Sequence, residues 1–543
     1  MVARTMPGTV AGSSPPIQER TTSAIGVEIP GVGLGPAMSI GPAPDWVDKV
    51  PAGLPCKGAT RVVLLDEQRS WLGPRLQHFT RIIYRVRDAE DARDFKLLRI
   101  PLGHDRAEVT VHALSVYRGT EERRHLDPWF TTTTPWQPIS KEAEAGPPHV
   151  VKDRPATLLH RLIDVEVGDY VEIAHTVVYP VEPELAGVIC GSLKLTREVP
   201  IQRQHHRILF PNRQVAIRAV AIEGQPIQRR HEDFTELVWY SQNVPALPET
   251  LLHERRRAST PHIQYSEIGS WDALVRLVRP FFECDAPPPE IAEIAHRLAR
   301  DLPSKRAQVR AVTRYVQDEL AFEAYDTREW LVRPKPLARV LAEKATDCKG
   351  KTFLMLSLLR ALGIAAEVVM VNHHGMDLRA ALPSLIDLDH MIVMVTVDGH
   401  EYFIDPTLRC QRGDLDALTP LPFLYGVPLV LGRGPVEIPH MCARPAPQSE
   451  ISARYTVGAP GKPTRLSYQR IDHGADADTA RTIQRGDDRV DLGRQLHAGF
   501  KRIYPELRAV DRVVTHDDET ANSYRLTAEL QFGSMWRRDP AGE

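Results

Sequence analysis

The stretch TDCKGKTFLMLSLLRALG, residues 346–363, decides how this chain is interpreted. Its Leu-rich second half is nearly apolar on every side and is too long for an ordinary strand, which predicts a buried helix. Thr346 or Asp347 suits the N-cap of this helix, and Gly363 suits its C-terminal stop. Cys348 therefore falls in the first turn, where free N–H groups and the helix dipole favour a thiolate and can bind an oxyanion. The alternative is a small buried core thiol.

A β-hairpin is predicted downstream in HMIVMVTVDGHEYFIDP, residues 390–406. Asp398-Gly399 is a strong signal for a two-residue turn, which places Ile392 opposite Asp405. His390 shares a face with Ile392, so His390 and Asp405 are diagonal neighbours, roughly 7 Å apart at the backbone. A base oriented by a carboxylate is what nucleophilic catalysis requires. The alternative is that both residues only end their strands.

Between the helix and the hairpin, a strand is predicted at residues 366–372, followed by a loop that contains His373 and His374. Neighbouring histidines are typical metal ligands, but a plain surface loop is the favoured interpretation. We therefore predict no metal ion and no organic cofactor.

The whole chain has 543 residues, which suggests three or four domains. Apolar residues make up 42% and charged residues 25%, and the formal net charge is −2. This composition is typical of an ordinary globular protein and lacks the strong basic patches of a nucleic-acid binder.

The cysteines are scattered and form no Cys-x-x-Cys pair, which favours free thiols in a reducing compartment and argues against structural zinc. No stretch of 18 apolar residues predicts a transmembrane helix, and the N-terminus lacks the apolar core of a secretory signal. We therefore predict a cytoplasmic location. The six cysteines are Cys56, Cys190, Cys284, Cys348, Cys410 and Cys442.

Changes in composition and period predict five segments. Residues 1–55 are rich in Gly, Pro, Ser and Ala and predict a flexible leader. Residues 56–230 predict a β-rich domain, because short alternating runs are separated by turn residues. Residues 231–284 predict a connector, and residues 285–420 contain two amphipathic helices followed by the helix and hairpin described above. Residues 421–543 predict a β-rich domain, and no obvious last element shows whether it is complete.

Residues 346–352, 358–366, 388–390 and 403–407 together resemble the transglutaminase-like superfamily, which shares a core with papain-like thiol proteases. Residues 60–230 look like the uncharacterised β-rich domain that often precedes this core in bacterial proteins. The resemblance implies an α+β fold: a β-rich, sandwich-like N-terminal domain, a papain-like core and a β-rich C-terminal domain.

The resemblance also implies a catalytic triad, which maps onto Cys348, His390 and Asp405. It does not imply one reaction, because members of the family include crosslinking enzymes, peptidases, amidases and inactive binders. The chain departs from the usual Gly-Asp-Cys motif by having Thr346 before Asp347. Trp330 is a weak candidate, by position, for a further donor to the oxyanion.

The predicted function is thiol-dependent acyl transfer or hydrolysis on peptide or protein amides, through an acyl-enzyme. The alternative is a non-catalytic interaction protein of the same fold, whose β-rich domains bind a partner. Retention of all three polar residues favours the enzyme, because an idle buried triad would carry a desolvation cost. The sequence does not specify the substrate, the acyl acceptor or the oligomeric state.

Overall fold

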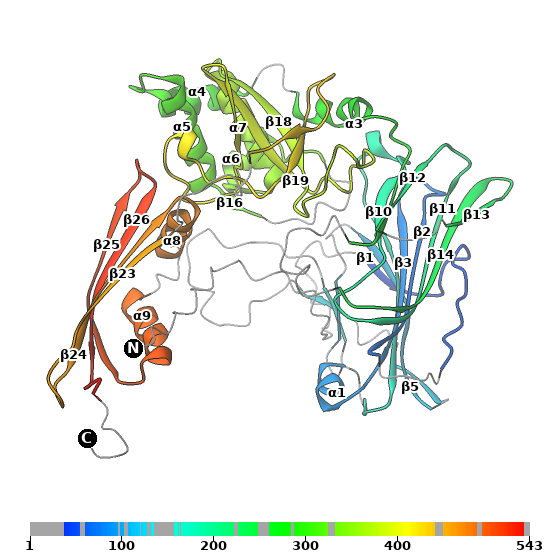
Figure 1. Cartoon of the computed structure of the whole chain (residues 1–543). Coiled ribbons are helices and arrows are strands. Elements are labelled where there is room, and N and C mark those ends of the chain that lie inside the picture. Colours follow the sequence, from blue (N-terminus) through cyan, green and yellow to red (C-terminus); the bar gives the residue numbers. More distant parts are fainter. Residues whose placement is uncertain are drawn as a thin grey trace.

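The chain folds into a β-rich N-terminal part, a mixed central core and a C-terminal sheet with two helices (Figure 1). In Figure 1 the core lies at the top, between the N-terminal sheets on the right and the C-terminal sheet on the left. None of the helices in the described ranges combines the length and apolar character needed to cross a bilayer. The computed structural model describes residues 37–54, 60–95, 98–101, 107–119, 121–126, 132–134, 157–160, 162, 164–221, 226–247, 260–283, 287–323, 332–439, 449–485 and 491–536.

A nine-stranded sheet dominates the N-terminal part. Its order is β1-β5-β9-β3-β2-β11-β14-β13, and β6 pairs with the end of β5. The alternating runs that predicted strands near residues 79–86, 108–114 and 170–177 form β3, β5 and β9. The strands are β1 (Ala37–Ile40), β2 (Val62–Ser70), β3 (Gln77–Arg85), β5 (Glu108–Arg118), β6 (Glu121–Arg124), β9 (Tyr170–Val178), β11 (Ile201–Pro211), β13 (Ile227–Arg230) and β14 (Phe234–Val244).

A three-stranded sheet packs on one face of the large sheet and makes a sandwich with it. Its order is β10 (Cys190–Lys194), β15 (His262–Ser266) and β12 (Ala216–Val220). Ile263 and Tyr265 of this small sheet share a buried cluster with Ile208, Leu237 and Trp239 of the large one. The remaining N-terminal elements are α1 (Ala89–Phe95), η3 (Pro183–Leu185) and the sheet of β4 (Leu98–Pro101), β8 (Thr157–His160) and β7 (Thr132–Thr134).

Residues 44–54 lie across the other face of the large sheet, within the segment that the sequence predicted to be a flexible leader. Side chains of the sheet hold the backbone of this segment. Gln68 Oε1 accepts from Asp48 N at 2.8 Å, and Gln68 Nε2 donates to Asp48 O at 2.7 Å. Arg81 donates to Val50 O at 2.5 Å. Composition does not reveal such contacts, because they depend on side chains elsewhere in the chain. Residues 1–36 lie outside the described residues.

Residues 231–284, which the sequence predicted to be a connector, contain ordered elements of the N-terminal sandwich and the core. β14 pairs with β11 and β13, and β15 is the central strand of the small sheet. Helix α3 (Trp271–Val278) and the 3-10 helix η5 (Arg279–Phe282) follow and pack in the core. Proline-rich breaks hid these elements, because they interrupt the alternation that a strand prediction needs.

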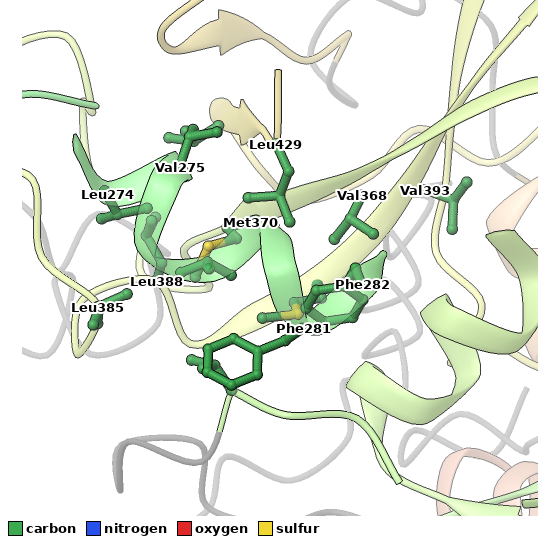
Figure 2. Close-up of a cluster of buried hydrophobic side chains, with 14 of the residues drawn as sticks. Leu274, Val275, Phe281, Phe282, Val368, Met370, Leu385, Leu388, Val393 and Leu429 are labelled. Carbon is green, nitrogen blue, oxygen red and sulfur yellow. The ribbon is translucent and has the colours of Figure 1, made fainter. Parts of the chain in front are cut away.

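The central core packs helices against a five-stranded sheet of order β20-β19-β18-β21-β22. Figure 2 shows Leu274 and Phe282 next to Met370 and Val368 of β18, all in one buried cluster. The elements are α4 (Pro289–Ala299), α5 (Lys305–Asp318), α6 (Leu337–Glu343), α7 (Cys348–Ala361), η7 (Leu415–Ala417), the short pair β16 (Ala321–Phe322) and β17 (Ala345–Thr346), and the strands β18 (Ala365–Val371), β19 (His390–Val397), β20 (His400–Ile404), β21 (Tyr425–Pro428) and β22 (Val436–Glu437).

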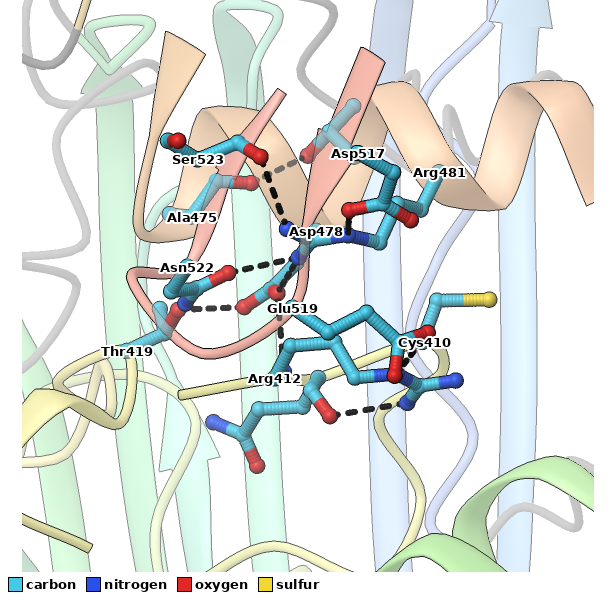
Figure 3. A network of polar contacts seen from close by, with 12 residues as sticks. Cys410, Arg412, Thr419, Ala475, Asp478, Arg481, Asp517, Glu519, Asn522 and Ser523 are labelled. Atoms are coloured by element: carbon cyan, nitrogen blue, oxygen red, sulfur yellow. Dashed lines mark hydrogen bonds and ion pairs between the residues drawn. The ribbon is translucent and has the colours of Figure 1, made fainter. Parts of the chain in front are cut away.

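The C-terminal part is a four-stranded antiparallel sheet, joined to the core by a buried polar network (Figure 3). Arg481 is fully buried and bonds Asp478 at 2.9 Å and Asp517 at 2.7 Å. Asp478 in turn accepts from Arg412 N of the core at 3.1 Å. The elements are β23 (Ser449–Thr456), β24 (Thr464–His473), β26 (Ser523–Phe532), β25 (Leu507–Asp518), α8 (Ala475–Arg485) and α9 (Leu492–Ile503).

Candidate active site

Cys348 is the first residue of α7, as the sequence predicted. Asp347 is the N-cap, and its Oδ1 accepts from Gly350 N at 3.0 Å. The Cys348 side chain is only 3% exposed and is a free thiol. Further along the helix, Thr352 Oγ1 donates to Met391 O at 3.1 Å, which fixes α7 against the start of β19. The first turn of α7 is thus held beside the strand that begins with His390.

The predicted hairpin register is confirmed. β19 and β20 pair Val397 with His400 and Val393 with Ile404, and Asp398 adopts a positive φ of 52° in the turn between them. This register brings His390 Nε2 to 2.9 Å from Oδ2 of Asp405, the residue that follows β20.

Asp405 is anchored independently of His390. Its Oδ1 accepts from Thr407 N at 2.8 Å and from Thr407 Oγ1 at 2.7 Å, so each carboxylate oxygen has its own partners. Gln317 Nε2 of α5 donates to the backbone carbonyl of Asp405 at 2.9 Å. These contacts fix both the position of the carboxylate and which oxygen faces the imidazole.

The charges of the three residues act on one another. Burial alone would lower the pKa of His390, but the carboxylate of Asp405 and a hydrogen bond with Cys348 raise it well above its usual value. Burial alone would raise the pKa of Asp405, but His390 and the bonds from Thr407 lower it. Because Nε2 of His390 is bonded to Asp405, Nδ1 is the ring nitrogen that remains available to a thiol. The arrangement favours an imidazolium held between a carboxylate and a sulfur.

Two lysines lie in the same helical turn, and the sequence analysis gave neither a role. Lys349 is buried and forms an ion pair with Asp347; burial alone would lower its pKa, but Asp347 and then Cys348 raise it. Lys351 is fully buried and donates to Val316 O at 2.9 Å. Burial lowers the pKa of Lys351 to about 7. A lysine in a sequence usually predicts an exposed side chain, so only the fold could reveal this pair.

Thr346, which stands where the family usually has glycine, packs against Gly350. A Cβ atom at position 350 would lie 2.0 Å from Thr346 Oγ1 and 2.9 Å from Thr346 Cβ. Thr346 is fully buried, and its hydroxyl has no hydrogen-bond partner within the described part of the chain. With threonine at position 346, residue 350 in the first turn of α7 has no room for a Cβ atom, and glycine fits there.

His373 lies against the His390 ring, in the loop that the sequence analysis favoured as a plain surface loop. The two ring centroids are 4.5 Å apart, and Phe423 contacts both rings. Asp389 holds His373, since Asp389 Oδ1 lies 3.3 Å from His373 Nδ1 and accepts from His373 N at 2.9 Å. Sequence spacing gave no signal of this contact, because it depends on how residues 372–389 fold back.

The sequence analysis also named Trp330 as a candidate oxyanion donor and expected no metal ion at the site. Trp330, the weak candidate for an oxyanion donor, lies outside the described residues. Across the described ranges, no group of three or more His, Cys, Asp and Glu side chains is arranged to hold a metal ion. Among the first-turn N–H groups of α7 that the sequence analysis proposed as oxyanion donors, that of Gly350 is already bonded to Asp347.

Two family models match the sequence. A domain of unknown function, DUF3857, matches residues 75–248, and the transglutaminase-like superfamily matches residues 292–404. Residues 292–404 form a transglutaminase-like domain. The DUF3857 match covers β3 to β14 of the sandwich and leaves out β1, β2 and β15; the whole sandwich is called the DUF3857 domain below. The predicted family and the predicted α+β fold class are both confirmed.

One solved structure has the same overall fold. A candidate protease from Parabacteroides distasonis matches 89% of this chain and 95% of its own, with a TM-score of 0.58 and 12% sequence identity. This likeness shows the shared fold. A candidate cysteine protease from Cytophaga hutchinsonii matches 46% of this chain and 74% of its own at 14% identity, with a TM-score of only 0.20. No curated protein matched the sequence.

Proposed function

We propose that the chain catalyses thiol-dependent acyl transfer on peptide or protein amides, with Cys348 as nucleophile, His390 as base and Asp405 as the residue that orients the base. The observation that carries this proposal is the 2.9 Å contact between His390 Nε2 and Asp405, at a histidine whose pKa Asp405 and then Cys348 raise. A nucleophile bonded to a base, and a base bonded to an orienting acid, are the parts that covalent catalysis requires.

The proposed reaction has two steps. The Cys348 sulfur attacks the amide carbonyl, the C–N bond breaks, and His390 delivers a proton to the leaving amine. Water or a second amine then attacks the thioester carbonyl and gives its proton to His390. The C–S bond breaks, the acid or the new amide leaves, and the proton on His390 returns to the sulfur. Asp405 stays ionised and stabilises the imidazolium. The N–H groups of the first turn of α7 stabilise the oxyanion in both steps.

Hydrolysis and transamidation differ only in the second acceptor, which is water in one case and an amine in the other. The rival proposal, a non-catalytic interaction protein, uses the same fold without this chemistry. The burial of His390 and Asp405, each 4% exposed and paired with the other, favours the enzyme, because buried polar side chains with no catalytic role would carry a desolvation cost.

The experiment that tests the proposal is acylation of the intact protein by a panel of peptide amides, followed by intact mass. A mass increase on the wild type that Cys348→Ala abolishes supports the nucleophile. Iodoacetamide labelling at pH 6–7 gives a second measure, and Cys348 should react faster than the other buried thiols, Cys190 and Cys410. Labelling of Cys348 no faster than Cys410, together with no acylation, would rule out the assignment.

A further inference from the structure

The three-stranded sheet of the DUF3857 domain contacts the chain segment that leads into His390. Residues of β10 and β15 alternate, so that one set faces the large sheet and the other set faces the transglutaminase-like domain. Cys190 pairs with Ser266, and Ser192 pairs with Gln264, so these four side chains share the second face. Cys190, Gln264 and Ser266 are 0–1% exposed. We call this face, made by residues 190, 192, 264 and 266, the platform.

Each platform residue contacts the segment of residues 372–389. Ser192 Oγ donates to Asp387 Oδ1 at 2.6 Å. Ser266 Oγ donates to the carbonyl of Pro383 at 2.5 Å, and the Cys190 sulfur accepts from Leu385 N at 3.3 Å.

Gln264 makes the remaining contacts of the platform. Its amide nitrogen lies 3.4 Å from Asp387 Oδ2 and 3.4 Å from Met376 Sδ, while its oxygen accepts from Leu382 N at 3.4 Å. The platform therefore satisfies polar atoms along most of the segment. An irregular segment that is buried needs such partners, because its backbone cannot form a ladder of its own.

The segment needs an external support because it is long. It connects β18 to β19, which pair directly with Val371 opposite His390, yet adjacent antiparallel strands are usually joined by two to five residues. Leu385 and Leu388 of the segment enter the same buried cluster as Leu274 and Met370 (Figure 2). The segment is thus held by apolar contacts on the core side and by the platform on the other.

The segment ends at the site. Asn372 Nδ2 donates to the carbonyl of Asp387 at 2.6 Å, which ties the last turn of the segment back to the end of β18. Asp387 stands three residues before His390, and Asp389 between them holds His373 against the His390 ring. Displacement of Asp387 would therefore move both the backbone of His390 and the ring packed on it.

A second contact between the two domains lies near Cys348. Arg333 bonds Glu182 at 3.3 Å and Glu184 at 2.6 Å, which joins the segment around η3 to the transglutaminase-like domain. Glu182 also contributes to the electrostatic environment of Lys349, the residue next to Cys348. The DUF3857 domain therefore contacts the surroundings of both the proposed base and the proposed nucleophile.

We propose that the platform positions His390 for catalysis, with Ser192 and Gln264 as positioning residues that act through Asp387. The DUF3857 domain then helps to set the geometry of the proposed active site. This inference rests on the proposed function, since it assigns His390 the role of base. It also predicts how fast the backbone amides of residues 376–390 exchange, and this rate does not depend on whether Cys348 is catalytic.

The experiment compares Ser192→Ala with Ser467→Ala in the full chain. Ser467 is a matched control, because it also lies on a strand and donates to a carboxylate, Glu529 Oε2, at 3.1 Å, but in the C-terminal sheet. Two quantities are measured: amide hydrogen exchange of residues 376–390, and the rate of Cys348 acylation by p-nitrophenyl acetate. For Ser192→Ala we expect faster exchange in the segment and acylation slowed about 10- to 100-fold. For Ser467→Ala we expect no change in either.

Labelling of Cys410 detects general loss of structure, because this thiol is buried away from the platform. Faster exchange limited to the segment, with Cys410 still protected, supports the proposal. Unchanged exchange and acylation in Ser192→Ala would overturn it, and so would exposure of Cys410 together with Cys348. If Ser192→Ala does not fold, Gln264→Met tests the same point, because it keeps the length and apolar bulk but removes the donor. If Cys348 of the wild type is not acylated, the proposed function fails, but the exchange of residues 376–390 still shows whether the platform holds the segment. The two failures can therefore be told apart.

Discussion

Replacement of Asp405 by asparagine should disable the proposed base without disturbing the fold. Thr407 donates two hydrogen bonds to Oδ1 of Asp405, at 2.8 and 2.7 Å, so the amide oxygen of the asparagine should take that place. The amide nitrogen would then face His390 Nε2 as a donor. His390 would have to accept there and carry its proton on Nδ1, the nitrogen that the proposal assigns to the thiol of Cys348. In that tautomer the ring cannot take the proton of the thiol.

The expected loss is about 10³- to 10⁴-fold in acylation rate, or about 4–5.5 kcal/mol in activation free energy. The assay is acylation of Cys348 by p-nitrophenyl acetate, followed by intact mass, with the melting temperature measured in parallel. Asp398→Asn is the matched control, because Asp398 lies in the turn of the same hairpin with φ 52°, a conformation that asparagine tolerates. Equal acylation rates for Asp405→Asn and Asp398→Asn would refute the role given to Asp405.

Three further predictions concern stability. Gly350→Ala should lower the free energy of unfolding by about 1–3 kcal/mol, because the added Cβ overlaps Thr346. Adding Thr346→Gly to that variant should restore the lost stability, as measured by urea denaturation. Lys351 has a pKa of about 7 in the folded chain and a usual value of 10.5, so the unfolded state binds more protons between those pH values. Wild-type stability should therefore rise relative to Lys351→Met from pH 7 to 9, by about 1 kcal/mol per unit, and parallel pH curves would contradict this. Arg481→Met should cost about 3–5 kcal/mol by leaving the buried carboxylate of Asp478 without its cation. Arg494→Met, at an exposed pair, should change stability by less than about 1 kcal/mol, and equal losses in the two variants would show that the buried pair adds no more stability than an exposed one.

The parts of the site that the sequence predicted depend on short-range rules. The N-cap at Asp347 and the hairpin turn at Asp398 are set by local backbone preferences, and the turn fixes the register. That register, together with the alternation of strand residues, was sufficient to predict that His390 and Asp405 would meet. Hence the geometry of two of the proposed triad residues follows from residues within one hairpin.

The parts that the sequence did not predict depend on contacts between distant segments. His373 reaches His390 because the segment of residues 372–389 folds back and Asp389 bonds His373, and Lys351 is buried where α5 supplies backbone acceptors. The order in residues 44–54 likewise depends on side chains of β2, β3 and β11. Local patterns carry no information on such contacts, since each partner is more than one element away.

The way the large sheet holds residues 44–54 has a consequence for how this segment tolerates substitution. Gln68, Arg81, Arg203 and Arg207 bond its main-chain atoms, while Val50 is 6% exposed and packs with Val63, Leu64 and Ile83 of the sheet. Gly53 adds a further constraint, because it has a φ of 64° and a Cβ there would lie 2.9 Å from the guanidinium of Arg203. We expect replacement of the exposed Asp48 or Lys49 to leave the segment in place, whereas a charged residue at position 50 or loss of the arginines should release it. The sheet therefore fixes the path of this segment, through hydrogen bonds to its main chain and packing around Val50.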